Sequence, residues 1–218
     1  MDAIDVVFPG GSMDLFAGIF KGNSVADYFN NLVAEVVYNR LLQEKKLNPG
    51  RHLRILEIGA GTGGTTDFVL KRIKHISENV TLFYTDISSS FTRYGQRRYE
   101  KSYPWVKFER LNIEDAPVTQ GFDEKSFDII YASNVLHDTK YLYHTLVQVK
   151  KLLRSRGLLV LNEFTVMKDL LLYTGGLLHG WWLFEDPENS RNHSINVGKV
   201  YSSVSYWIHM LSVTQRSS

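Results

Sequence analysis

Cysteine is absent from this chain of 218 residues, proline occurs only five times, and no long run of apolar residues is present. Without cysteine the chain has no disulfide and no thiolate metal site, which fits a reducing compartment. The most apolar stretch, residues 170–184, is too short to cross a bilayer and is interrupted by glycines and a histidine. The first residues lack the basic and apolar pattern of a secretory signal. We therefore predict a cytoplasmic protein with no membrane segment.

An excess of either charge is missing as well, since 25 Lys and Arg residues face 23 Asp and Glu residues and leave a net charge of +2. This balance gives no broad basic field, so nucleic acid is not an expected partner. The 44% of hydrophobic and 22% of charged residues are ordinary for a globular protein. The length suits one sizeable core, and we expect one domain with appended segments.

Strand and helix patterns alternate through the middle of the chain. The expected strands cover residues 53–58, 81–86, 106–111, 127–133 and 158–163, and the expected helices between them cover residues 65–76, 91–101 and 142–154. A turn is expected at residues 156–157, before the last strand. Nearly continuous apolar strands that alternate with amphipathic helices predict a parallel sheet with helices on both faces, an α/β fold of the Rossmann-like type.

Two flanking segments complete the expected domain. Residues 1–50 are predicted to form an N-terminal helical cap, with one helix that has Ser24 as its N-cap and ends near Lys46. Residues 51–164 are the predicted core. The alternation stops after Glu163, and residues 165–218 are rich in aromatic residues and glycine. We interpret this last segment as a lid over the carboxyl ends of the strands.

The most informative motif covers residues 57–64 and reads Glu-Ile-Gly-Ala-Gly-Thr-Gly-Gly. An apolar strand enters a glycine-dense turn that opens a helix, and glycine lets the backbone turn sharply and approach a ligand closely. Asp86 ends the next expected strand, where a carboxylate can hold both hydroxyls of a ribose. The turn and the carboxylate together predict a nucleoside-containing cofactor.

The glycine spacing alone leaves the identity of this cofactor open. Gly59, Gly61 and Gly64 also satisfy the dinucleotide fingerprint, and a turn that only packs strand against helix is the plain alternative. Glu57 favours another cofactor, because a carboxylate at the strand tip weakens the positive potential that a pyrophosphate needs. It would favour an ammonium and a sulfonium instead. S-adenosylmethionine carries both groups and is the cofactor that we predict.

A candidate general base lies further along the chain. His137 follows the fourth expected strand and Glu163 closes the fifth, with one helix between them. A right-handed crossover places such strands about 4.8 Å apart when they are neighbours. We expect the two side chains to share a hydrogen bond beyond the carboxyl ends of the strands, where ligands bind in parallel sheets. A lone histidine is more often a core or surface residue, but a carboxylate that orients it makes it a base.

Five stretches together resemble one family. They are Glu-Ile-Gly-Ala-Gly-Thr-Gly-Gly, Tyr-Thr-Asp-Ile-Ser, Asn-Val-Leu-His-Asp-Thr, Leu-Leu-Val-Leu-Asn-Glu and Gly-Leu-Leu-His-Gly-Trp-Trp. They are similar to the methyltransferase domains embedded in modular polyketide synthases, and most similar to the C-methylating domains of bacterial assembly lines. The resemblance covers most of residues 7–186. The glycine motif alone indicates only a methyltransferase, whereas the histidine and tryptophan motifs are much more specific.

The resemblance implies roles for named positions. It implies a catalytic dyad of His137 and Glu163. The cofactor-binding residues that it implies are Glu57, Gly59, Gly61, Asp86, Asn112, Ile113, Asn134 and Tyr28. Asn112 stands where the family usually has an aspartate beside the adenine, Asn134 would line the methionine portion, and Tyr28 would close the pocket from the cap helix. The substrate contacts that we expect are His179, Trp181 and Trp182, and no metal ligand is expected.

The reaction implied by the resemblance is S-adenosylmethionine-dependent methylation of the α-carbon of a β-ketoacyl chain on an acyl carrier protein, beside neighbouring polyketide synthase domains. O-methylation of a polyketide hydroxyl or enol by the same dyad stays open, as does a non-catalytic, methyltransferase-like structural domain. Nicotinamide-dependent reduction is the weakest alternative. The sequence also departs from the family, because the final strand pair of this fold is not evident before Ser218 and residues 191–205 match less well.

Overall fold

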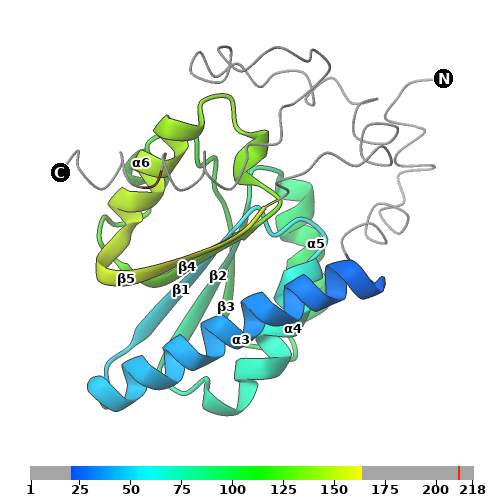
Figure 1. Ribbon diagram of the computed structural model, residues 1–218, viewed down its shortest axis with the longest axis vertical. Coiled ribbons are helices and arrows are strands. Elements are labelled where there is room, and N and C mark those ends of the chain that lie inside the picture. The colour runs from blue at the N-terminus through cyan, green and yellow to red at the C-terminus, as the bar shows by residue number, and fades with distance from the viewer. Residues whose placement is uncertain (1–20, 164–210, 212–218) are drawn as a thin grey trace.

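A computed structural model describes residues 21–163 and Leu211. Its centre is a parallel sheet of five strands in the order β3-β2-β1-β4-β5 (Figure 1). The strands are β1 (Leu53–Ile58), β2 (Val80–Asp86), β3 (Val106–Arg110), β4 (Phe127–Ser133) and β5 (Leu153–Asn162). The helices are α3 (Ser24–Leu47), α4 (Gly64–Ile73), α5 (Ser89–Tyr99) and α6 (Leu142–Leu152), with short 3₁₀ turns at Lys74–Ile76, Pro117–Gln120 and Leu136–Asp138.

The strand order reverses at β1, which pairs with β2 on one side and with β4 on the other. In parallel α/β sheets this reversal opens a crevice beyond the carboxyl ends of the strands, and ligands bind there. The glycine turn follows β1 directly, so the sequence places its most distinctive motif at this crevice. The predicted Rossmann-like sheet is thereby confirmed.

Helices cover both faces of the sheet, as predicted. On one face, apolar residues of α3 and α4 pack on Ile55 of β1 and Leu82 of β2. On the other face, α6 contributes Leu146 and Val149 to a second cluster that includes Ile130 of β4. In Figure 1, α3 runs obliquely across the sheet. Residues alternate between the two clusters along β1 and β4, which explains why these strands read as continuous apolar runs.

The start of α3 differs from the prediction by one residue. Asn23, and not Ser24, precedes the helix with extended backbone, and its side-chain oxygen accepts a hydrogen bond from the Ala26 N–H (2.9 Å). Asparagine is as good an N-cap as serine, so composition alone does not decide between adjacent candidates. The helix ends at Leu47, one residue beyond the expected Lys46.

The predicted turn before β5 is wrong in detail. The structure ends α6 at Leu152 and begins β5 at once, but the pairing with β4 shifts: Phe127 faces Leu153, whereas Ile129 faces Leu158. The intervening residues form an irregularity within the strand, and Arg156 takes a φ of 62° there. Regular pairing with β4 begins at Leu158, so Gly157 lies in a strand irregularity rather than in a turn that precedes the strand.

Part of the expected domain lies outside the described residues. This applies to most of the N-terminal cap before α3, to nearly all of the lid at residues 165–218, and therefore to His179, Trp181 and Trp182. The expectation about the final strand pair falls in the same segment, and the division into cap, core and lid stays a prediction. Among the described helices, none combines the length and the apolar character that a membrane crossing requires.

Candidate active site

The glycine turn between β1 and α4 is built from left-handed backbone. Gly59, Gly61 and Gly63 have φ values of 64°, 56° and 79°, which side chains other than glycine rarely adopt. Space adds a second constraint at Gly59, because a Cβ there would lie 2.4 Å from a methyl carbon of Val135. At Gly61 a Cβ would meet nothing within 4 Å. The turn is therefore packed against the protein at Gly59 and open at Gly61, where a ligand can approach.

Asp86 closes β2 beside this turn. Its Oδ2 accepts a hydrogen bond from the Gly61 N–H (2.9 Å), and its Oδ1 accepts one from the Ser88 N–H (2.8 Å). The side chain is buried, and burial raises the pKa of this carboxyl while the two backbone hydrogen bonds oppose the shift. Each carboxylate oxygen has a second acceptor site. Asp86 thus keeps the capacity to accept two further hydrogen bonds, as the vicinal hydroxyls of a ribose require.

Glu57, near the end of β1, contacts β4 and the first turn of α4 through its side chain. Its Oε2 accepts hydrogen bonds from the Thr66 hydroxyl (2.7 Å) and the Tyr131 hydroxyl (2.9 Å). Burial, with a smaller contribution from Asp86, raises the pKa of Glu57 from 4.5 to about 7. Ionisation of this buried group is therefore favoured by a nearby positive charge. The sequence predicted the carboxylate but not the partners from α4 and β4, whose hydroxyls carry no signal by themselves.

The structure brings His137 and Glu163 together. Oε2 of Glu163 bonds the Nδ1 atom of His137, and Oε1 accepts hydrogen bonds from the backbone N–H groups of Val135 (3.3 Å) and Leu136 (2.9 Å). A carboxylate only accepts, so Nδ1 carries the proton and Nε2 presents its lone pair. The Oδ2 atom of Asp138 lies 3.8 Å from Nε2, which is longer than a hydrogen bond. Nε2 is thus the ring nitrogen that carries no proton of its own.

The loop that carries His137 is held in place by contacts of two consecutive residues. Asn134 has a φ of 56°, and its N–H donates to the carbonyl oxygen of Asn162 (2.7 Å) on β5. The next residue, Val135, packs against Gly59. No described residue bonds the side-chain amide of Asn134, so this amide is available to a ligand. Sequence analysis missed Val135, because a valine in an apolar motif gives no functional signal.

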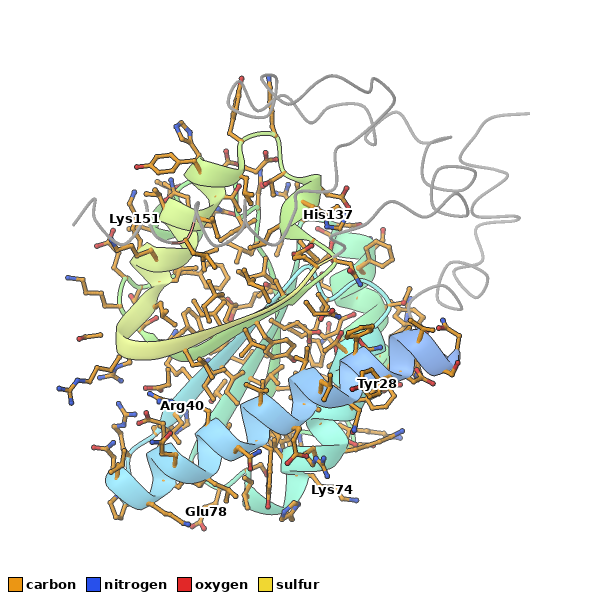
Figure 2. All side chains as sticks on the ribbon, viewed as in Figure 1. Tyr28, Arg40, Lys74, Glu78, His137 and Lys151 are labelled. Atoms are coloured by element: carbon orange, nitrogen blue, oxygen red, sulfur yellow. The ribbon has the colours of Figure 1, made fainter. Side chains whose placement is uncertain are left out.

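Three other predicted cofactor residues lie in different surroundings. The Asn112 side-chain amide donates to Asp115 Oδ2 (2.7 Å), and its Oδ1 accepts from the Glu114 N–H (3.2 Å), so both polar atoms are engaged locally. Ile113 is buried in the cluster on the α6 face. Tyr28, on α3, is 60% exposed, with its ring edge-on to Phe29. Figure 2 shows Tyr28 and His137 on separate parts of the molecule, near the start of α3 and beyond the sheet edge.

The assembled groups match the chemistry of S-adenosylmethionine. Asp86 offers free acceptor sites for a ribose, the turn is open at Gly61, and Glu57 is a buried acid whose ionisation a cation would favour. A pyrophosphate would instead meet the Glu57 carboxylate at the strand tip, whereas Asp86 suits the ribose of either cofactor. These observations favour the cationic cofactor over the dinucleotide that the glycine spacing had left open.

Comparisons with known proteins agree with this interpretation. The sequence model of a family described as "Methyltransferase domain" matches residues 56–159. Polyketide synthase PksR of Bacillus subtilis (strain 168) is 42% identical over 190 residues, which is 85% of this chain and 7% of that protein. The crystal structure of DszA carbon methyltransferase matches with a TM-score of 0.89 and 42% identity, over 98% of this chain and 54% of the other.

A further solved structure bears on the cofactor. The trans-methyltransferase CalH, in complex with SAH, matches with a TM-score of 0.75 and 31% identity, over 97% of this chain and 54% of that one. This chain thus spans about half the length of the solved domains and a small part of the polyketide synthase that it matches. Fold, sequence and cofactor chemistry lead to the same conclusion: the chain carries an S-adenosylmethionine-dependent methyltransferase domain, and it is similar to a segment of a polyketide synthase.

Proposed function

We propose that this domain methylates the α-carbon of a β-ketoacyl chain carried on an acyl carrier protein, as part of a polyketide synthase. The observation that carries the proposal is the His137–Glu163 pair at the carboxyl edge of the sheet. A C–H group between a ketone and a thioester carbonyl is acidic enough for an imidazole to deprotonate. The DszA structure is titled a carbon methyltransferase, which supports transfer to carbon.

The cofactor would be held by the groups around the glycine turn. Asp86 would accept the ribose hydroxyls, Gly61 would allow close approach of the backbone, and the free amide of Asn134 would bond the methionine portion. The ionised carboxylate of Glu57 would compensate the positive charge of the cofactor. When bound, the cofactor supplies an electrophilic methyl group.

His137 and Glu163 would perform the proton transfer. Nε2 of His137 takes the proton from the substrate carbon, and the electron pair left behind is delocalised over the two carbonyl oxygens. Glu163 holds Nδ1–H and stabilises the imidazolium that forms. Because Glu163 also binds two backbone N–H groups of the same loop, the imidazole is oriented before substrate arrives. The deprotonated carbon is then the nucleophile for methylation.

The test is product analysis with a carrier-bound β-ketothioester. We expect His137→Ala to lower turnover at least about 100-fold, the lower end of what a general base contributes, while binding S-adenosylhomocysteine as the wild type does. His144→Ala is the matched control, because His144 is an exposed histidine on α6 beside Tyr141 and Tyr143. Near-normal product from His137→Ala would contradict the proposal.

The same experiment separates the alternatives. A β-hydroxy substrate is offered in parallel, and fragmentation in the mass spectrometer locates the new methyl group. Methyl transfer to oxygen alone would replace C-methylation by O-methylation. Failure of the wild-type protein to bind S-adenosylmethionine in calorimetry would indicate a structural domain without catalysis.

A further inference from the structure

Two side chains of β2 hold one glycine of the turn. Tyr84 and Asp86 are two residues apart on the strand, so they point to the same face of the sheet. The Tyr84 hydroxyl donates a hydrogen bond to the Gly61 carbonyl oxygen (2.6 Å), and the Gly61 N–H donates one to Asp86 Oδ2 (2.9 Å). Both polar groups of the Gly61 backbone are therefore bound by the same strand.

The hydroxyl of Tyr84 is held in place by close packing of its ring. The ring is fully buried, and its centroid lies 6.1 Å from that of Tyr99 and 5.6 Å from that of Phe108. On α5, a Cβ at Gly95 would lie 2.6 Å from this ring, so the helix packs directly on it. Burial raises the pKa of the Tyr84 hydroxyl, and the carboxylates of Glu57 and Asp86 add to the shift. Tyr84 therefore stays a donor across the working pH range.

Gly61 needs this support because nothing else in the described structure covers its outer side. Its φ of 56° lies in the left-handed region, and no described atom lies within 4 Å of the place of a Cβ. The Gly61 N–H is one of two backbone donors that orient Asp86, and the other comes from Ser88 at the start of α5. A shift of Gly61 would therefore turn the carboxylate away from the ribose.

We propose that Tyr84 is a positioning residue for cofactor binding, which fixes Gly61 and through it the orientation of Asp86. The inference rests on the role proposed above for Asp86. Tyr84 itself touches neither cofactor nor substrate. Its effect is thus confined to cofactor affinity and leaves the proton transfer at His137 untouched.

The first test is Tyr84→Phe, which removes the hydroxyl and keeps the ring against Gly95. We expect the Kd for S-adenosylhomocysteine, measured by calorimetry, to rise about tenfold, as loss of one well-formed hydrogen bond implies. The KM for S-adenosylmethionine rises in parallel, and kcat at saturating cofactor changes less than about twofold. Tyr103→Phe is the control from the same aromatic cluster, since no described residue bonds its hydroxyl. It should leave Kd, KM and kcat unchanged.

A merely structural role predicts a different result, namely a lower melting temperature with an unchanged Kd, and this would overturn the proposal. The double variant Tyr84→Phe/Asp86→Asn gives the sharper test. If Tyr84 acts through Asp86, adding Tyr84→Phe to Asp86→Asn weakens binding by less than about twofold, whereas a full additional tenfold loss contradicts the proposal.

A second route covers the case in which Tyr84→Phe does not fold. Gly95→Ala presses on the ring and displaces the hydroxyl without removing it, so we expect the same weakening of binding. Unchanged affinity in a folded Gly95→Ala protein would overturn the inference. Absence of binding to the wild-type protein would instead refute the proposed function, so the two failures are distinguishable.

Discussion

Two carboxylates at opposite ends of the sheet are buried to the same extent but have different hydrogen-bond and ion-pair partners. Asp128 of β4 and Glu57 of β1 are each 3% exposed. Asp128, near the amino end of its strand, bonds the Arg51 guanidinium (2.9 Å) and the Arg54 N–H (2.9 Å), and Arg154 lies 3.7 Å away. Glu57, at the carboxyl end, bonds only hydroxyl groups, and no described cation pairs with it.

The difference separates a carboxylate that is paired within the protein from one that is not. A buried charge is tolerated when it is paired, and Asp128 meets that condition within the protein itself. Burial makes ionisation of the Glu57 side chain unfavourable, and no described cation offsets that cost. A cation from outside the described residues would offset it. If Glu57 has the role proposed above, it would favour binding of the sulfonium donor over the product that remains after methyl transfer, which has lost the sulfonium charge.

The largest effect is expected at the amino end of the sheet. Asp128→Asn leaves Arg51 and Arg154 without their shared carboxylate, and we expect the free energy of unfolding to fall by about 3 kcal/mol. This is the low end of the cost of breaking a buried pair, because both arginines keep partial exposure. Chemical denaturation measures it, and the Kd for S-adenosylhomocysteine should not change.

The control for this prediction is Asp123→Ala. Asp123 pairs with Arg54 at 3.4 Å but its side chain is 80% exposed, so its loss should cost less than about 0.5 kcal/mol. A weakened cofactor affinity in Asp128→Asn would show that the two ends of the sheet are not independent.

A smaller effect of opposite sign is expected for Glu57→Gln. Glutamine keeps an acceptor for the hydroxyls of Thr66 and Tyr131 but removes the buried charge, so the free protein should gain about 2 kcal/mol of stability at pH 8. The pKa of Glu57 is about 7 in the folded protein against 4.5 as its ordinary value. The folded state therefore binds more protons between these values, and the wild type gains stability as the pH falls through this window.

At pH 5 the gain of Glu57→Gln over the wild type should fall to roughly a quarter of its value at pH 8, because the folded wild-type carboxyl is then protonated while the unfolded one is still partly ionised. Thermal denaturation at both pH values checks the sign. A variant less stable than the wild type at pH 8 would show that the ionised group stabilises the fold, and Glu57 would then resemble Asp128.

The smallest effect concerns the pH dependence of cofactor binding. Binding of a sulfonium favours ionised Glu57, so the affinity for S-adenosylmethionine relative to S-adenosylhomocysteine should rise about tenfold between pH 6 and pH 8. The ratio is the proper measure, since both ligands share the same amino acid group and only one carries the sulfonium charge. Calorimetry at three pH values measures it, and Glu57→Gln should give a flat ratio.

The sequence predicted the elements and contacts that follow from strand order. The bounds of β4 agree with the prediction, and the meeting of His137 with Glu163 followed from the expectation that their strands are neighbours. Patterns within short segments of the sequence suffice to predict strand bounds. The contact between two strand ends follows from them, because parallel pairing brings equivalent strand ends to one edge of the sheet. The role of the pair in catalysis stays a prediction.

Contacts that depend on tertiary packing were beyond reach of the sequence. Asn112 stays a predicted neighbour of the adenine, and the hydrogen bond of its side chain to Asp115 within the same loop is a local contact that the sequence did not indicate. The hydrogen bond from the Tyr84 hydroxyl to the Gly61 carbonyl oxygen joins residues far apart in the chain. A tyrosine in an apolar strand gives no sequence signal that it makes such a bond. The bulge in β5 was read as a turn, because glycine serves both.

The close packing of Val135 against Gly59 has a consequence for the redesign of this enzyme class. The glycine turn and the loop that carries His137 meet at this contact, where Val135 fills the space that a side chain at position 59 would need, and the φ of Gly59 excludes such a side chain as well. Libraries that diversify the histidine loop to accept new acyl chains should therefore keep the volume at position 135 fixed. A larger side chain at position 135 would otherwise press on the glycine turn.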